Sequence, residues 1–166
     1  MNTALVRKAI IFSMERHKDQ KRSVNDYPYI VHPISVFSIV KKYKESKNSE
    51  MLLCAALLHD ILEDTDTTYE ELVADYSKGI ADLVLEVTND SDQIDIHGKI
   101  GYMKQKMMNM TSYGLIIKLA DNLDNLTDNP SVKQTKRYME VIDYIEINRP
   151  LTKTHRSLIR EIRESV

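Results

Sequence analysis

The chain has 166 residues, 42% of them hydrophobic and 29% charged, with a formal net charge of −2. These values are typical of a soluble globular domain, here one domain over residues 1–166. They exclude a disordered chain, an overall electrostatic binder of nucleic acid, and a membrane span, because no apolar run reaches roughly 18–20 residues.

The number of cysteines limits which bonds and metal sites the chain can form, and it indicates the cellular compartment. Cys54 is the only cysteine in the sequence, so neither an internal disulfide nor a cluster of thiolate zinc ligands can form. We expect a cytoplasmic protein.

Helical periodicity runs through most of the sequence, and only four glycines and four prolines interrupt it. We find no alternating strand pattern, so we expect an all-α fold, a compact single-domain bundle of about eight to ten helices. The segments 19–33 and 89–98 are expected to be loops. The expected helices, in chain order, cover 3–18, 34–43, 50–63, a segment that begins near 67–68, 79–88, 99–110, 112–126, 134–147 and 151–164.

The segment 50–63 is apolar around most of its circumference, yet it contains His59, Asp60, Glu63 and, just after it, Asp64. On a continuous helix His59 and Glu63 would share one face, as would Asp60 and Asp64. Buried carboxylates either become protonated or find a cation, and a divalent metal ion meets that need. The alternative is that the helix ends at Asp60 and the acids are solvated.

A second apolar helix, 115–126, contains Asp121 in its middle, and Asn125 shares the face of Asp121. The alternative to metal binding is a salt bridge between Asp121 and Lys118, three residues earlier. The His-Asp pair at 59–60 favours the metal interpretation.

His32 is the third part of the pattern. It precedes Pro33, where an extended backbone would let the imidazole project from a helix start; the alternative is a purely structural histidine. His17, His97 and His155 have no comparable neighbours, and we assign them no function.

Together, His32, His59, Asp60 and Asp121 offer two imidazoles and two carboxylates. This donor set suits Mn²⁺, Fe²⁺, Zn²⁺ or Co²⁺ better than Ca²⁺. A bound divalent ion lowers the pKa of water toward neutrality. Glu63 and Asp64 would then orient or deprotonate that water.

Three segments resemble the motifs of one known family, the RelA/SpoT-type (p)ppGpp hydrolases of the HD superfamily. The first runs from Arg16 through Gln20 and Arg22 to the residues 28–33, the second covers 55–65, and the third covers 118–125. The length suits a stand-alone small alarmone hydrolase of the Mesh1-like kind. Because no synthetase, TGS or ACT region is recognisable, we expect hydrolase activity only.

The resemblance implies a bundle of about ten helices and one divalent ion, typically Mn²⁺. It implies metal binding by His32, His59, Asp60 and Asp121, and catalytic roles for Glu63 and Asp64. It further implies hydrolysis of the 3′-pyrophosphate of a small nucleotide, giving GDP or GTP and pyrophosphate. The residues expected to bind the substrate are Lys18, Lys21, Arg22, Asn125 and Tyr138.

The sequence also departs from the family pattern. Ser23 replaces a basic residue, the loop at Asn25–Tyr27 lacks the usual glycine, and Asn122 replaces the basic residue that often follows the metal-binding aspartate. These changes leave open whether the substrate is (p)ppGpp or an adenosine alarmone, (p)ppApp.

Other functions remain open as well. The chain could be a nucleotidase or an NADPH 2′-phosphatase, or an inactive HD module used for binding. A helical adaptor that binds through its methionines is the remaining possibility, although Met103, Met107, Met108 and Met110 are expected to fill the core.

Overall fold

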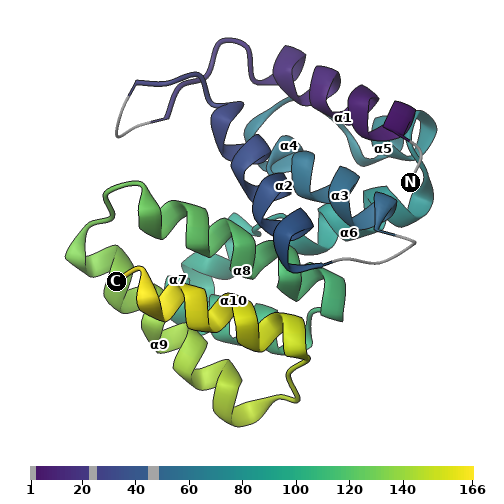
Figure 1. Ribbon diagram of the computed structural model, residues 1–166. Coiled ribbons are helices and arrows are strands. Elements are labelled where there is room, and N and C mark those ends of the chain that lie inside the picture. The colour runs from purple at the N-terminus through teal and green to yellow at the C-terminus, as the bar shows by residue number, and fades with distance from the viewer. Residues whose placement is uncertain (1–2, 23–25, 45–48) are drawn as a thin grey trace. The chain divides into compact units, whose positions relative to one another are not determined.

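The computed structural model describes residues 3–22, 26–44 and 49–166, and over these ranges the chain is all-α (Figure 1). It contains ten helices there, and no strand beyond an isolated bridge between Lys21 and Pro28. The predicted fold class is therefore confirmed. None of the described helices is both long enough and apolar enough to cross a membrane.

The contacts within the chain group it into two compact units, Met1–Thr88 and Asn89–Val166. We describe each unit by itself, and the expectation of one domain over 1–166 stays a prediction. The first unit contains α1 (Thr3–Arg16), α2 (Val31–Tyr43), α3 (Glu50–Leu57), α4 (Ile61–Asp64), α5 (Tyr69–Asp75) and α6 (Lys78–Val87).

Helix α3 forms the centre of the first unit. Every residue from Leu52 to Leu58 is at most 1% exposed, and α3 packs against α1, α2 and α6 (Figure 1). A helix that is apolar all round must be buried on all sides, which explains this position.

The continuous helix predicted over 50–63 is wrong. Helix α3 ends at Leu57, and a turn at Leu58–Asp60 separates it from α4. The amide of Leu58 donates to the carbonyls of Cys54 and Ala55, and the amide of Ile61 donates to that of Leu58, so the turn satisfies its own backbone groups. His59 and Asp60 therefore lie in a turn, not on one helix face with Glu63 and Asp64.

The start of α2 also differs from the prediction. The helix begins at Val31, so His32 is helical and not extended. The amide of His32 donates to the carbonyl of Tyr29 at 2.9 Å. Pro33 is accommodated because it lies in the first turn, where a missing N–H removes no intrahelical hydrogen bond.

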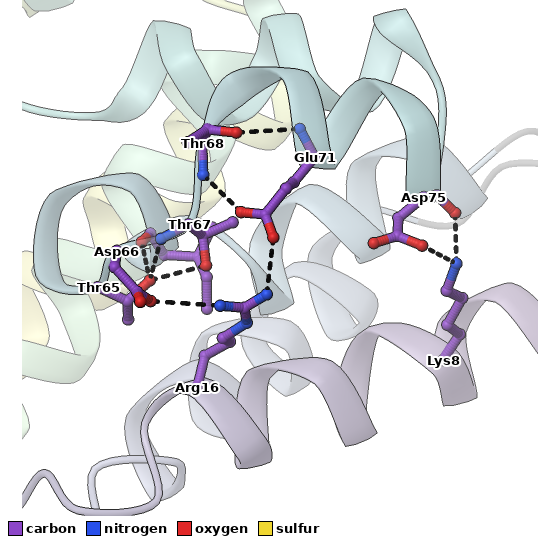
Figure 2. Close-up of polar contacts among 9 residues, drawn as sticks. Lys8, Arg16, Thr65, Asp66, Thr67, Thr68, Glu71 and Asp75 are labelled. Atoms are coloured by element: carbon purple, nitrogen blue, oxygen red, sulfur yellow. Dashed lines mark hydrogen bonds and ion pairs between the residues drawn. The ribbon is translucent and has the colours of Figure 1, made fainter.

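Ion pairs join α1 to the α4–α5 segment (Figure 2). Arg16 donates to Asp66 at 3.2 Å and to Glu71 at 2.9 Å. Glu71 also closes a capping box with Thr68 at the start of α5, close to where the sequence predicted that this helix begins. At the other end of α5, Lys8 binds the carboxylate of Asp75 at 2.7 Å.

The second unit contains four helices. The segment 89–98, predicted as a loop, is mostly helical, because α7 begins at Ser91 and continues past Gly98 with a kink there. Met103, Met107 and Met110 are at most 6% exposed, which confirms that they fill the core, whereas Met108 is only half-buried, so the prediction is wrong for this residue. The four helices are α7 (Ser91–Asn109), α8 (Ser112–Thr127), α9 (Val132–Asn148) and α10 (Lys153–Glu164).

Candidate metal centre

Two imidazoles and one carboxylate converge in the first unit. The Nε2 atoms of His32 and His59 lie 3.2 Å apart. The Oδ2 atom of Asp60 lies 3.0 Å from Nε2 of His59 and 3.4 Å from Nε2 of His32. Both histidines are at most 2% exposed. The first turn of α2 and the turn between α3 and α4 position these side chains.

This arrangement fits a divalent metal ion. Nδ1 of His59 lies 2.9 Å from the carbonyl oxygen of Ala56, so Nδ1 carries the proton of the neutral ring and Nε2 presents its lone pair to His32 and Asp60. Ligands at roughly 2.1 Å from one ion lie roughly 3.0–3.4 Å apart in an octahedral or tetrahedral shell. The three measured separations fall in that range, whereas facing lone pairs would repel one another without a cation or a proton.

Tyr29 contacts the same carboxylate. Its hydroxyl donates to Oδ2 of Asp60 at 2.6 Å. Burial and the charge of Asp60 raise the pKa of Tyr29, so the phenol stays protonated and remains a donor. Burial alone would raise the pKa of Asp60, but protonated imidazoles at His59 and His32 hold it well below its ordinary value, and a bound metal ion would supply the same positive charge to neutral rings. Asp60 is therefore a carboxylate, the form that binds metal.

The two acids predicted to be catalytic lie one turn beyond, on α4. Glu63 and Asp64 are exposed, and Gln20 donates to the backbone carbonyl of Asp64 at 2.6 Å, which ties the loop after α1 to α4. Although the residue as a whole is exposed, partial burial of its carboxyl and the charge of Asp60 raise the pKa of Asp64, while a hydrogen bond from Tyr29 lowers it in part.

The predicted cationic contacts lie on the loop after α1. Lys18 is exposed and Arg22 is half-buried. Lys21 is also exposed and pairs with Asp26 at 2.9 Å. The expectations for Ser23 and for the start of the segment 25–27 lie outside the described residues.

Asp121 lies in the second unit, in the middle of α8, and is 7% exposed. Its Oδ2 lies 3.1 Å from Nζ of Lys118, so the salt bridge considered from the sequence does form. Its Oδ1 accepts a hydrogen bond of 2.5 Å from the side-chain amide of Asn125. These two contacts orient the carboxylate of Asp121.

Two further predicted positions lie in the second unit. Tyr138 is half-buried on α9, and burial together with the nearby charge of Asp121 raises its pKa. Asn122 is 1% exposed, and its amide nitrogen has no hydrogen-bond partner within the part of the chain that the structure describes.

Sequence reasoning missed two residues beside the metal centre. Tyr29 precedes His32 by three positions, and this helical spacing could have indicated it. His17 was assigned no function, yet it is 2% exposed and its ring centre lies 4.8 Å from that of Tyr29. Its Nδ1 also lies 2.7 Å from Oε1 of Gln20. His155, by contrast, caps α10 together with Thr152. This structural role agrees with the sequence analysis, which assigned His155 no function.

Known proteins resemble the chain in sequence and in structure. It is 34% identical over 158 residues to the guanosine-3′,5′-bis(diphosphate) 3′-pyrophosphohydrolase of Aquifex aeolicus, covering 88% of this chain but only 21% of that protein. It is 34% identical over 134 residues to the Xenopus tropicalis enzyme of the same name, MESH1, covering 76% of this chain and 70% of the relative. The solved structure of a metazoan SpoT orthologue that hydrolyses ppGpp superposes with a TM-score of 0.80 at 25% identity, over 99% of this chain and 97% of the other.

A family model supports the same assignment. The HD domain model matches residues 29–126, which include His32, His59, Asp60 and Asp121. The match covers more than half of the 166 residues. The chain therefore belongs to the HD domain family.

Proposed function

We propose that this protein is a metal-dependent phosphohydrolase that removes the 3′-pyrophosphate of (p)ppGpp or of a related alarmone such as (p)ppApp. The products would be GDP or GTP, or their adenosine counterparts, and pyrophosphate. The observation that carries the proposal is the convergence of His32, His59 and Asp60, in a chain whose relatives are named for this reaction.

The proposed ligands are His32, His59, Asp60 and Asp121, and the proposed metal is one Mn²⁺ ion. His32, His59 and Asp121 are buried, and each offers one ligand atom. The mixed nitrogen and oxygen donors favour a first-row transition metal over Ca²⁺. When bound, such an ion lowers the pKa of water and offsets the charge of a phosphate group.

The remaining residues prepare the substrate and handle protons. Glu63 and Asp64 would accept the proton of the attacking water and return it to the leaving 3′-oxygen. Lys18, Lys21 and Arg22 would offset the charge of the phosphates, and the planar guanidinium can bind two oxygens at once.

Asn125 and Tyr138 are the proposed contacts to the nucleoside. Asn125 already bonds to Asp121, and the charge of Asp121 acts on Tyr138, so the two side chains lie near one carboxylate. The proposed setting is cytoplasmic, with a small nucleotide as the partner and neither nucleic acid nor membrane required.

The decisive experiment compares turnover of ppGpp, pppGpp, ppApp and NADPH in the presence of Mn²⁺, with separate detection of phosphate and pyrophosphate. We expect pyrophosphate from an alarmone with the wild type and at least a thousandfold loss in Asp60→Ala. Asp66→Ala is the matched control, because Asp66 is a nearby acid whose side chain is 91% exposed. If NADPH is turned over and none of the three alarmones is, the substrate assignment fails.

An inactive binding module is the remaining alternative, and metal analysis decides it. We expect about one Mn²⁺ per chain and a higher Tm when Mn²⁺ is added, because a ligand that binds only the folded state stabilises that state. A protein whose Tm does not respond to Mn²⁺, Fe²⁺, Zn²⁺ or Co²⁺ would favour the inactive module.

A further inference from the structure

An open cavity of about 900 Å³ lies in the second unit, between the kink of α7 and the first half of α9. The kink shapes one wall: Gly98 has φ of 68° and ψ of 152°, a conformation that interrupts the helix and that side chains disfavour. Residues 97–101 line the cavity on this side, and residues 132–140 line it on the other.

The walls are strongly cationic. Lys99, Lys133, Lys136 and Arg137 line the cavity, and among the described lining residues Glu140 is the acid. Four positive charges and one negative charge give a formal local charge of +3, in a chain whose net charge is −2. Glu140 is itself paired with Lys104 at 2.7 Å, so its charge is partly offset. A concave surface of one sign concentrates ions of the opposite sign.

The cations of α9 share one face of that helix. Lys133, Lys136 and Arg137 are spaced by three and four residues, as one helical face requires. The guanidinium of Arg137 lies 5.3 Å from the ring centre of Tyr138, which restricts its motion. The cavity thus presents positive charge from one face of a helix that packs against α7.

Apolar side chains complete the lining. Ile100 and Val132 lie among the cations, and Val132 is 72% exposed. Apolar walls with a few convergent charged groups are the usual composition of a small-molecule site, and this volume falls in the usual range. An apolar surface beside a cationic cluster matches a molecule with a flat ring at one end and phosphates at the other.

We propose that this cavity binds a nucleoside polyphosphate, with its phosphates at the cations of α9 and its base against Ile100 and Val132. The proposal goes beyond the proposed function, because occupancy requires neither the metal ion nor hydrolysis. None of the proposed metal ligands or catalytic acids lines this cavity.

Calorimetric titration of the full chain with ADP, in EDTA, tests the proposal. Because ADP is also a product of the proposed hydrolysis, the titration includes Arg22→Gln, which lacks a proposed active-site contact. We expect Arg22→Gln to keep the ADP site of the cavity, and the double variant Lys133→Gln, Lys136→Gln to bind ADP at least tenfold more weakly at that site. The matched control is Lys153→Gln, Arg156→Gln on α10, which removes two cations that line a different hollow in the same unit. Its Kd for ADP should stay within twofold of the wild-type value.

A steric variant tests the location independently. A Cβ atom built at Gly101 has His97 Cβ at 3.8 Å as its nearest neighbour, an ordinary contact. Gly101→Leu should therefore fold with an unchanged or higher Tm and lose ADP binding, while Gly101→Ala should keep it.

Four outcomes would overturn the proposal. They are no binding of ADP to the wild type, equal binding by the lysine double variant, equal binding by Gly101→Leu, or adenosine binding as tightly as ADP. Inorganic tripolyphosphate binding as tightly as ADP would overturn the assignment of the base contact. Because EDTA removes the ion that the proposed hydrolysis needs, a failure of the hydrolase proposal leaves these results intact.

Discussion

The hydroxyl of Tyr29 controls the position of a proposed metal ligand. It donates to Oδ2 of Asp60 at 2.6 Å, in a site where that oxygen also faces two imidazoles. Removing the hydroxyl in Tyr29→Phe should keep the ring packing and weaken Mn²⁺ binding by roughly 10–100-fold, the usual effect of losing a hydrogen bond to a ligand. The measurement is the Kd of the metal-free protein for Mn²⁺ by calorimetry.

Tyr27→Phe is the matched control for this change. Tyr27 is on the same loop and is 59% exposed, so loss of its hydroxyl should leave the Kd for Mn²⁺ unchanged. Equal affinities in wild type and Tyr29→Phe would show that the Asp60 carboxylate needs no hydrogen bond to hold its position.

The sequence could single out His59 and Asp60 because both interrupt an apolar pattern with groups that are costly to bury, and it could single out His32 from its place before Pro33 and from the His-Asp pair that follows. It could not predict the contact of Tyr29, because a tyrosine fits an ordinary half-buried position and its partner is 31 positions away. The burial of His17 was missed for the same reason, since a histidine outside an apolar run gives no signal of burial.

At the scale of single elements, the sequence located the helices better than their interruptions. The turn at Leu58–Asp60 was missed because Ile61 and Leu62 continue the apolar pattern across it. Local hydrogen bonds of the turn, not a glycine or a proline, end α3. The segment 89–98 was missed for the opposite reason: its polar residues suggest a loop, but Asp90 caps the helix by accepting a hydrogen bond from Gln93.

Replacing either of two glycines in α7 by alanine should change the stability of the fold, but in opposite directions. Gly98 has a φ of 68°, so Gly98→Ala should destabilise the fold by about 1–3 kcal/mol. Gly101 is helical and has room for a Cβ atom, so Gly101→Ala should stabilise by about 0.5–1 kcal/mol. Urea unfolding of both variants gives the comparison. A neutral Gly98→Ala would mean that the backbone relaxes out of the kink.

Glu71 contacts both α1 and its own helix α5, so it should contribute more to the free energy of unfolding than its neighbour Glu70. It closes the capping box of α5 and accepts from Arg16 of α1 (Figure 2). Glu71→Ala should lower the free energy of unfolding by about 1–2 kcal/mol, the sum of a lost cap interaction and a partly exposed ion pair. Glu70→Ala, an exposed acid in the same turn, should change it by less than about 0.5 kcal/mol. Equal losses of unfolding free energy in Glu71→Ala and Glu70→Ala would show that the contacts of Glu71 between α1 and α5 do not stabilise the fold.

At the scale of the whole molecule, the all-α class could be predicted because glycine and proline are few and helical periodicity continues from the first segment to the last. The grouping of contacts into the units Met1–Thr88 and Asn89–Val166 could not be predicted from the sequence. The polar segment near the boundary is mostly helical, and the composition does not change there as it would at a linker.

The whole fold should lose stability at alkaline pH because Cys54 is buried in α3. Burial raises the pKa of its thiol from an ordinary 9.0 to about 12. The folded state therefore favours the neutral thiol, and the unfolded state releases the proton first. The stabilisation is fully present below about pH 9 and is lost as the pH rises toward 12, by about 3 kcal/mol near pH 11.

Comparison with Cys54→Ala isolates the contribution of Cys54 together with its effect on Tyr76, because the charge of Cys54 helps to raise the pKa of Tyr76. The other alkaline titrations are common to both proteins. The free energy of unfolding, measured in urea at pH 8, 9, 10 and 11, should fall more steeply in the wild type than in the variant. The difference in unfolding free energy between the wild type and Cys54→Ala should be nearly constant from pH 8 to 9 and should become smaller above pH 9. A constant difference up to pH 11 would show that the thiol ionises as readily in the folded chain as in the unfolded one. Reaction of the native thiol with iodoacetamide at pH 8 should correspondingly be slow, and urea should accelerate it.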